Sequence, residues 1–413
     1  MASVVTPQWV VNEIAYQFLN RCVLAKNANR SYDSQFRVKG AKVGATINAR
    51  LPQRPRAASG AQLNKQPVID QVTPISITDQ TNIGLELSSY TLTLEKSEIM
   101  RTCIIPAANA LVQDMENKGF SRLYKKIPNS IGSVGVSPTA GLTYSQGNAK
   151  LVDMNGNNRD LVAILSSDQS AVIADAQKAY FAPTGAISSA FTKGQFGGPA
   201  YGIEKWFSSP NVAVHTTGAT TTATPIVSAS ANVVEGATSL SSTGWGSGNT
   251  TIQEGDWFTM AGVYEINSAT FTSTNRLRQF TVTQTTTDSS GTVTLNFYPP
   301  LYAAATPLQN VTALPANSAV ITYLGMSAGG SQTATTSRQG LIFAEDSLVL
   351  AMADAEDVDA PVCVFARDEE LGISMRLTKS FDISNDNNLA RLDMFWGWNA
   401  IRPEWTCLRV QGA

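Results

Sequence analysis

Histidine and charge are what this sequence has least of. His215 is the single histidine among 413 residues, and 15% of residues are charged, whereas about a quarter is usual. Ser-His-Asp hydrolases, HExxH proteases and histidine-rich metal sites depend on histidine, so the sequence argues against these classes. His215 stands beside Thr216 and Thr217, and we expect it to be a solvated or hydrogen-bonded loop residue. The low charge indicates a surface that is partly buried against another molecule.

The sequence also lacks other signatures of catalysis, metal binding and export. The motifs GxxxxGK[ST], strand-linked GxGxxG and GxSxG are missing, and no pair of carboxylates stands out, so we expect no enzyme, no cofactor and no metal. The N-terminus does not resemble an export signal, and the apolar stretch 103–112 is too short to span a bilayer. We therefore expect synthesis in the cytoplasm and no membrane contact. The cysteines, none in a CxxC pair, predict reduced and buried thiols: Cys22, Cys103, Cys363 and Cys407.

Charge is distributed unevenly along the chain. Residues 1–65 contain ten basic and two acidic residues, although the whole chain has 30 basic and 32 acidic ones. Residues 345–370 contain nine acidic residues against Arg367 alone. Segments of opposite sign in one chain predict contact between copies of that chain. The near-neutral total argues against a dedicated nucleic-acid binder, since such domains are usually strongly basic.

Hydrophobic periodicity predicts an arm, a loop and a long helix in the first part of the chain. Apolar residues repeat at helical spacing from Pro7 to about Lys26, which predicts an amphipathic N-terminal arm over residues 1–35. Alternation from Val43 to Leu51, broken by "PQRPRAASGAQ", predicts an exposed, basic two-stranded loop over 36–82. A helical face from about 97 to 123 predicts a long core helix that Pro106 kinks or restarts.

The rest of the chain predicts an α+β body with an all-β insertion. "LVAILSSDQSAVIADAQKAYF" indicates a buried strand, a capping pair of Ser166 and Gln169, and a helix. From about Thr216 the composition changes to Thr, Ser, Ala and Gly, and the strands that follow include a hairpin turning at 288–291. We expect an inserted β-barrel-like domain over 218–325, and a body formed by 83–217 together with 326–413.

The C-terminal segment predicts a hairpin with one apolar face. Apolar residues alternate over 373–383 and 392–400, with a turn in "NDNN" at 385–388. Trp396 and Trp398 then share one face, while Arg391, Asp393 and Asn399 share the other. Packing explains these rings better than a ligand cage, and each buried side chain contributes about 2–3 kcal/mol.

This order of elements resembles the major capsid proteins of tailed double-stranded DNA bacteriophages. Among these, it is most similar to coat proteins of short-tailed Salmonella-type phages, whose HK97-like fold carries an inserted domain. The likeness lies in "GDWFTMAGVYEIN", "RQGLIFAEDSL" and "SFDISNDNNLARLDMFWGWNAIRPEW". The first half of the chain matches in architecture alone. In the family the inserted domain has a charged loop, whereas here residues 227–242 are nearly uncharged.

The resemblance implies a structural protein of the virion. Copies would assemble as pentamers and hexamers into an icosahedral shell around a scaffolding protein, with a portal protein at one vertex. The shell would expand as DNA is packed, touching the DNA without sequence specificity, and a decoration protein is an optional partner. The body would comprise the A and P domains and a spine helix, and assembly would take place in the host bacterial cytoplasm.

Contacts between copies are expected where the charges are opposite. We expect the basic loop of one copy to meet the acidic segment of another, each exposed pair contributing about 0–1 kcal/mol. Solvent exposure of both segments is a comparably good interpretation. The candidate residues are Arg37, Lys39, Lys42, Arg50, Arg54 and Arg56 on one side, and Asp354, Glu356, Asp357, Asp359, Glu369 and Glu370 on the other.

Other functions predict different features. Some relatives join a loop lysine to a body asparagine, for which Lys39 or Lys42 and Asn399 would be candidates. The branch that this sequence resembles does without that link, so we expect solvated lysines. A secreted adhesin should bring an export signal, and a phage tail-tube or decoration protein should lack the long helix. A carboxylate-based glycosidase would explain the acids and tryptophans, and would turn over a substrate.

Overall fold

The fold was analysed in a computed structural model of the chain, which is mixed α+β and divides into two compact units. Unit 1 comprises Met1–Ala49, Val72–Gly119 and Leu348–Ile401, and unit 2 comprises Arg50–Gln71, Phe120–Ser347 and Arg402–Ala413. The structure describes residues 22–31, 46–57, 60–61, 65–88, 105–155, 160–176, 199–221, 224–228, 233–246, 248, 250–326, 330–358, 362–367, 374–385 and 387–413. The predicted N-terminal helix lies outside these residues, apart from its last few positions.

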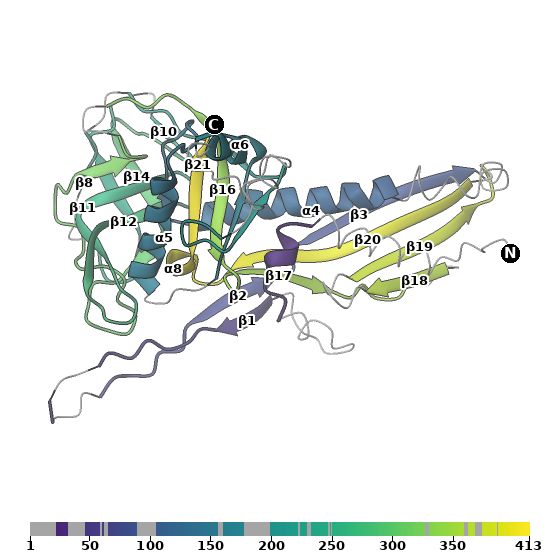
Figure 1. The fold of residues 1–413 in the computed structure, drawn as a ribbon, viewed down its shortest axis with the longest axis horizontal. Helices are drawn as coiled ribbons and strands as arrows, with labels where there is room; N and C mark the ends of the chain where they lie inside the picture. The colour runs from purple at the N-terminus through teal and green to yellow at the C-terminus, as the bar shows by residue number, and fades with distance from the viewer. Residues whose placement is uncertain are drawn as a thin grey trace, which may run out of the picture. The chain divides into compact units, whose positions relative to one another are not determined.

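Unit 1 is built on a sheet whose central strand is β20 (Asn387–Ala400). One side of β20 pairs first with β19 (Ser374–Asp382) and then with β17 (Leu348–Ala353), and its other side pairs with β3 (Asp79–Ser88). The strand β18 (Val362–Arg367) pairs with β19 at the edge. Figure 1 shows these strands side by side. The predicted C-terminal hairpin is thus present, but its described turn residues are 383–385, because Asn387 and Asn388 already pair within β20.

The tryptophans of β20 are packing residues, and their indole N–H groups find partners. Trp396 and Trp398 are buried; Trp396 Nε1 donates to Thr81 Oγ1 at 3.1 Å, and Trp398 Nε1 donates to the Met115 carbonyl at 3.2 Å. Met115 belongs to α4 (Ile105–Lys126), which has Pro106 in the first turn of its described part. These bonds join the strand to the helix, since a buried indole N–H is costly without an acceptor.

A segment near the N-terminus is attached to the same helix. Glu116 is buried on α4 and accepts the backbone N–H groups of Val23 and Leu24 at 2.6 and 2.8 Å. These two residues precede the short 3-10 helix η1 (Ala25–Asn27), so the carboxylate satisfies donors that a helix start leaves open. The Asn29 backbone continues the attachment by donating to the Leu348 carbonyl at 2.8 Å.

The polar face of β20 is largely buried as well from Asp393 to Asn399, which alternation alone does not predict. The strand β2 (Val72–Ser76) approaches this face, where the Ser76 carbonyl would lie 2.0 Å from a Cβ at Gly397. The Asn399 amide donates to the Pro74 carbonyl, and Asn399 and Asp393 are 8% and 1% exposed. β2 in turn pairs with β1 (Thr46–Arg50) at the base of the extended loop. Gly397 therefore permits a second layer over β20.

Unit 2 contains a sheet in the order β4-β21-β16-β5-β6, with β7 also paired to β16. Its core includes residues of helix α5 (Gly141–Asn155) and of α6 (Ser167–Ala176), while the short α8 (Pro403–Thr406) contributes Trp405. The predicted capping pair is confirmed: Ser166 N donates to Gln169 Oε1 at 3.0 Å, and Gln169 N donates to Ser166 Oγ at 3.2 Å. The strands are β4 (Ser130–Ile131), β5 (Leu161–Leu165), β6 (Lys205–Ser208), β7 (Val214–Thr216), β16 (Thr336–Ala344) and β21 (Cys407–Gly412).

Six further strands of unit 2 form a closed barrel. They follow the order β15-β11-β12-β14-β9-β8, and β8 bonds back to the segment that leads into β15, where Val227 N donates to the Ala319 carbonyl at 2.9 Å and Ser318 N donates to the Val227 carbonyl at 3.0 Å. A small ladder of β10 (Thr251–Ile252) and β13 (Thr286–Thr287) lies outside this ring. The barrel strands are β8 (Ile226–Ser228), β9 (Ala237–Thr243), β11 (Trp257–Ile266), β12 (Ser273–Val282), β14 (Thr292–Leu301) and β15 (Ile321–Tyr323).

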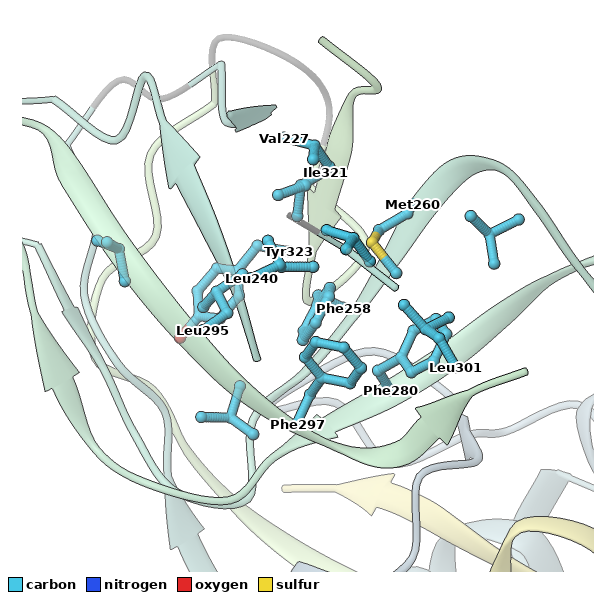
Figure 2. Packing of buried hydrophobic residues seen from close by; sticks show 14 of the residues in the cluster. Val227, Leu240, Phe258, Met260, Phe280, Leu295, Phe297, Leu301, Ile321 and Tyr323 are labelled. Atoms are coloured by element: carbon cyan, nitrogen blue, oxygen red, sulfur yellow. The ribbon is translucent and has the colours of Figure 1, made fainter. Parts of the chain in front are cut away.

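The barrel interior is filled by aromatic and aliphatic side chains (Figure 2). Phe258, Phe280 and Phe297 contact one another with ring centroids 5.3–5.9 Å apart. Phe280 and Phe297 lie on the strands that the sequence predicts as a hairpin, and β12 and β14 do pair, with Val282 opposite Phe297. The bounds 218–325 of an inserted domain stay a prediction, because the barrel belongs to unit 2 as a whole.

The contact between α4 and β20 predicts an unusual outcome for Gly119→Ala. Alanine normally stabilises a helix by about 0.5–1 kcal/mol relative to glycine. Here a Cβ would lie 2.7 Å from Trp398 Nε1 and 3.1 Å from Leu24 Cδ2. We therefore expect the free energy of unfolding to fall by about 1–3 kcal/mol in urea titrations, as overpacked cores do. Lys118→Ala, one residue away and half-exposed, is the control and should change it by less than about 0.5 kcal/mol.

Candidate assembly surfaces

The part of the extended loop within unit 2 consists of two arms joined by glutamine side chains. Gln53 donates to the Ile69 carbonyl at 2.6 Å and accepts the Ile69 N–H at 3.3 Å. Gln66 likewise donates to the Arg56 carbonyl at 2.5 Å and accepts the Arg56 N–H at 2.9 Å. Each amide replaces one backbone bridge, so the arms stay together although most of the loop is not a regular strand.

Two arginines of the loop contact other segments of unit 2. Arg54 Nη2 donates to the carbonyls of Pro307 and Gln309 at 3.0 and 3.1 Å, and Arg56 Nη1 donates to Gln309 Oε1 at 3.0 Å. The Arg54 guanidinium carbon lies 4.9 Å from the Trp405 ring centroid, and that of Arg56 lies 4.5 Å from the Phe271 centroid. Both rings are almost fully buried, so the arginines cover them in cation–π geometry.

A third arginine holds the base of the loop. Arg402 Nη2 donates to the Pro52 carbonyl at 2.6 Å and to Gln71 Oε1 at 2.8 Å, and so contacts both arms. Burial, and then repulsion from Arg402, lower the pKa of Arg54 to about 10, and Glu404 opposes this only in part. The guanidinium of Arg54 is therefore held in surroundings that compensate its charge poorly.

The acidic segment of unit 1 is exposed and lies next to arginine. Asp354, Glu356 and Asp357 are all exposed, and the Glu356 carbonyl accepts a hydrogen bond from Arg376 Nη1 at 2.7 Å. Glu345, which the sequence places in the same acidic run, belongs to unit 2 and forms an ion pair with Lys205. The acidic run is therefore divided between the two units.

A groove of about 770 Å³ crosses the polar face of the unit 1 sheet. Asp393 lies in its wall with a fully buried carboxylate, which accepts from Arg376 Nη2 at 3.0 Å, Arg391 Nε at 2.9 Å and Gln80 Nε2 at 3.2 Å. Burial raises the pKa of Asp393, but these hydrogen bonds outweigh burial and hold it below its ordinary value. Lys379 also lines the groove, and burial lowers the pKa of its amine.

The sequence predictions for individual residues can now be placed. Arg50 is exposed in β1, Arg54 and Arg56 are half-buried against their own chain, and the acidic candidates of 354–357 are exposed. Whether these groups meet between copies stays a prediction. The other candidates lie outside the described residues: Arg37, Lys39, Lys42, Asp359, Glu369 and Glu370.

Some residues that form these surfaces were not predicted from the sequence. Phe271 and Trp405 form the platform for the loop arginines, and nothing in their local sequence indicates it. The alternation of β20 predicts that Asp393 and Arg391 lie on the same polar face, two positions apart. This spacing could have predicted the ion pair that the two residues form. Asn399, the candidate for a crosslink, has its amide engaged by the Pro74 carbonyl and the Ala400 N–H.

His215 was expected to be a solvated or hydrogen-bonded loop residue; it is hydrogen-bonded, but it is buried in a strand. The residue lies in strand β7 and is 6% exposed, so it is neither solvated nor in a loop. Its Nε2 lies 2.8 Å from Asp256 Oδ1, and its Nδ1 lies 3.1 Å from the Tyr124 hydroxyl. Asp256 also accepts the backbone N–H groups of Gln253 and Gly218, at 2.7 and 3.1 Å. His215 is therefore part of a buried network.

The described part of the chain has neither a metal-binding cluster nor a helix that could span a membrane. Among those residues, no three His, Cys, Asp or Glu side chains are grouped so that they could hold a metal ion. None of the described helices is both long and apolar enough to cross a membrane.

Comparison with protein families identifies the chain. The family described as "P22 coat protein - gene protein 5" matches residues 3–412. The chain belongs to the P22 coat protein family. It is therefore a major capsid protein that forms the shell of a phage particle, with a structural role. This confirms the capsid fold and function expected from the sequence, and decides against the tail-tube, decoration and glycosidase alternatives.

Solved structures with similarity to this coat protein come from phages and from a virus-like particle. A chain of Mycobacterium phage Che8 has 10% sequence identity and a TM-score of 0.46, covering 94% of this chain and 91% of that one. The capsid structure of cyanophage P-SCSP1u has 9% identity, a TM-score of 0.43, and coverages of 94% and 89%. A virus-like particle from Pyrococcus furiosus has 8% identity, a TM-score of 0.40, and 97% coverage of both chains. No individually curated protein sequence matches the chain.

The buried carboxylate of the groove gives a pH-dependent prediction for Asp393→Asn. Because the folded pKa is lowered, Asp393 stabilises the fold above its unfolded pKa of about 3.9, and this stability is lost as pH falls through the folded value. We expect the variant to unfold in urea with about 1–3 kcal/mol less free energy at pH 7, as for a lost hydrogen bond to a charged group.

At about pH 3 and below, the wild-type carboxylate is itself increasingly protonated, so the difference between the two chains should shrink. A deficit that is the same at pH 3 and pH 7 would show that Asp393 acts through its shape alone. Asp382→Asn is the comparison: Asp382 is half-buried at the end of β19, and its described hydrogen bonds stay within its own turn. These bonds also lower its pKa, so we expect a smaller deficit at pH 7 that likewise shrinks at low pH.

Proposed function

We propose that this coat protein builds its shell through many weak contacts between oppositely charged surfaces of neighbouring copies. The observation that supports this most directly is the exposure of Arg50 at the base of the loop and of Asp354, Glu356 and Asp357 in unit 1. Exposed pairs contribute about 0–1 kcal/mol each, so wrong contacts can dissociate while the closed shell gains from their number.

We further propose the partners and the course of assembly that the sequence resemblance implies. Copies would form pentamers and hexamers around a scaffolding protein, with a portal protein at one vertex and a decoration protein as an optional addition. Assembly would take place in the host bacterial cytoplasm, and the finished shell would expand as double-stranded DNA is packed inside. The barrel would serve as an inserted domain over 218–325.

A charge exchange tests the proposed pairing. Arg50→Glu is cleaner than changes at Arg54 or Arg56, because Arg50 does not dock the loop against its own chain among the described residues. We expect it to slow shell formation at low salt by about two- to fivefold, measured by light scattering, with the effect disappearing at about 1 M salt.

The compensating variant identifies the partner. Adding Asp357→Lys to Arg50→Glu should restore part of the rate if these segments meet between copies, and Lys118→Glu, at a half-exposed lysine outside both segments, is the control. Unchanged kinetics for Arg50→Glu at low salt would rule out the pairing. Electron microscopy of the products reports separately whether closed shells form at all.

A further inference from the structure

Arg54 and Arg56 are held inside their own chain by neutral groups. Their described hydrogen-bond acceptors are the Pro307 and Gln309 carbonyls and the Gln309 side-chain oxygen. Among the ion pairs of the described residues, none includes either guanidinium. The other contacts of these arginines are the faces of Phe271 and Trp405.

Neutral acceptors satisfy a guanidinium less well than carboxylates do. A carboxylate adds the attraction between opposite charges and can accept two parallel bonds from one guanidinium, which a single carbonyl oxygen cannot do. The guanidinium of Arg54 also has an unused donor, because its Nη1 is buried without a hydrogen-bond partner. A carboxylate that reaches this place therefore competes favourably with the groups that hold the loop now.

The two arms of the loop can move away from the rest of unit 2 together. Its two arms are joined to each other by Gln53 and Gln66, independently of the barrel. Among the described residues of the loop, undocking its tip side would break the contacts of Arg54 and Arg56, while Arg402 keeps the base in place. The cost is the loss of the arginine contacts and the partial exposure of the Phe271 and Trp405 rings, with no described strand or helix broken.

We propose that Arg54 and Arg56 form a docking strip for carboxylates of a second copy of this chain, and that Phe271, Gln309 and Trp405 hold the strip closed in the free subunit. The occupant is the exposed acidic segment 354–357 of the other copy. This inference rests on the charge pairing proposed above. It adds that each subunit restrains its own loop until carboxylates of a neighbouring copy bind Arg54 and Arg56.

Two variants with opposite expected effects test this restraint. Gln309→Met removes the side-chain oxygen that accepts from Arg56 and keeps the length of the side chain. We expect it to speed shell formation by about two- to fivefold at low salt, roughly the equilibrium effect of losing one contact of the half-exposed Arg56, although Gln309 itself is buried. Arg54→Met together with Arg56→Met removes the strip itself and should slow shell formation by at least as much.

A purely structural role predicts a different pattern. If the contacts only stabilise the subunit, both variants lower its thermal unfolding midpoint and neither speeds assembly, which would overturn the inference. Hydrogen exchange gives a second readout on subunits that fold: amides of 52–57 should exchange faster in Gln309→Met than in wild type, while those of β12 remain unchanged. Equal exchange of 52–57 in both chains would also contradict the restraint.

The result separates this inference from the proposal on which it rests. If Arg50→Glu slows assembly but Gln309→Met does not speed it, charge pairing holds and the restraint is wrong. If Arg50→Glu has no effect, the pairing itself fails. Gln284→Met is a matched control for the glutamine change, because Gln284 is exposed and its side chain contacts only Asn296 by a described hydrogen bond.

Discussion

Burial of β20 on both faces is the constraint on which unit 1 depends. On one face, Trp398 donates to the backbone of α4, and Gly119 leaves the space that its ring occupies. On the other face, the missing side chain at Gly397 lets β2 approach closely. Asn399 and Asp393 are buried there with hydrogen-bond partners, which offset the cost of burying polar groups. A strand held in this way cannot slide by one residue, because every side chain would change faces. It therefore fixes the register of β3, β17 and β19 as well.

Sequence patterns predicted the elements with strong periodicity or with self-contained chemistry. The capping pair of Ser166 and Gln169 is local to one helix start, and the alternation in β12 and β14 follows from one buried barrel face. Alternation in β20 predicted the strand, but not the layer over its polar face. That layer depends on a segment more than 300 residues away in the sequence, and the only local sign of it is the missing Cβ at Gly397.

The assembly surfaces were harder to predict than the fold. Charge counting found the basic loop and the acidic segment, since excess charge is visible in composition alone. It did not reveal that Arg54 and Arg56 already have partners, because those partners are carbonyls and rings contributed by distant parts of the chain. His215 shows the same limit: hydroxyl-rich neighbours in sequence suggested solvent, whereas Asp256 and Tyr124 enclose it in space.

The hydrogen bonds between β8 and the segment before β15 have a consequence for a protein that must become very concentrated around its own copies. An open sheet of this length would present two rows of unpaired backbone groups, onto which the sheet of a neighbour could add. Closure of the ring leaves no such rows in this part of the molecule. Along the described strands of this ring, crowded subunits then touch through side chains, and such contacts come apart again when the geometry is wrong.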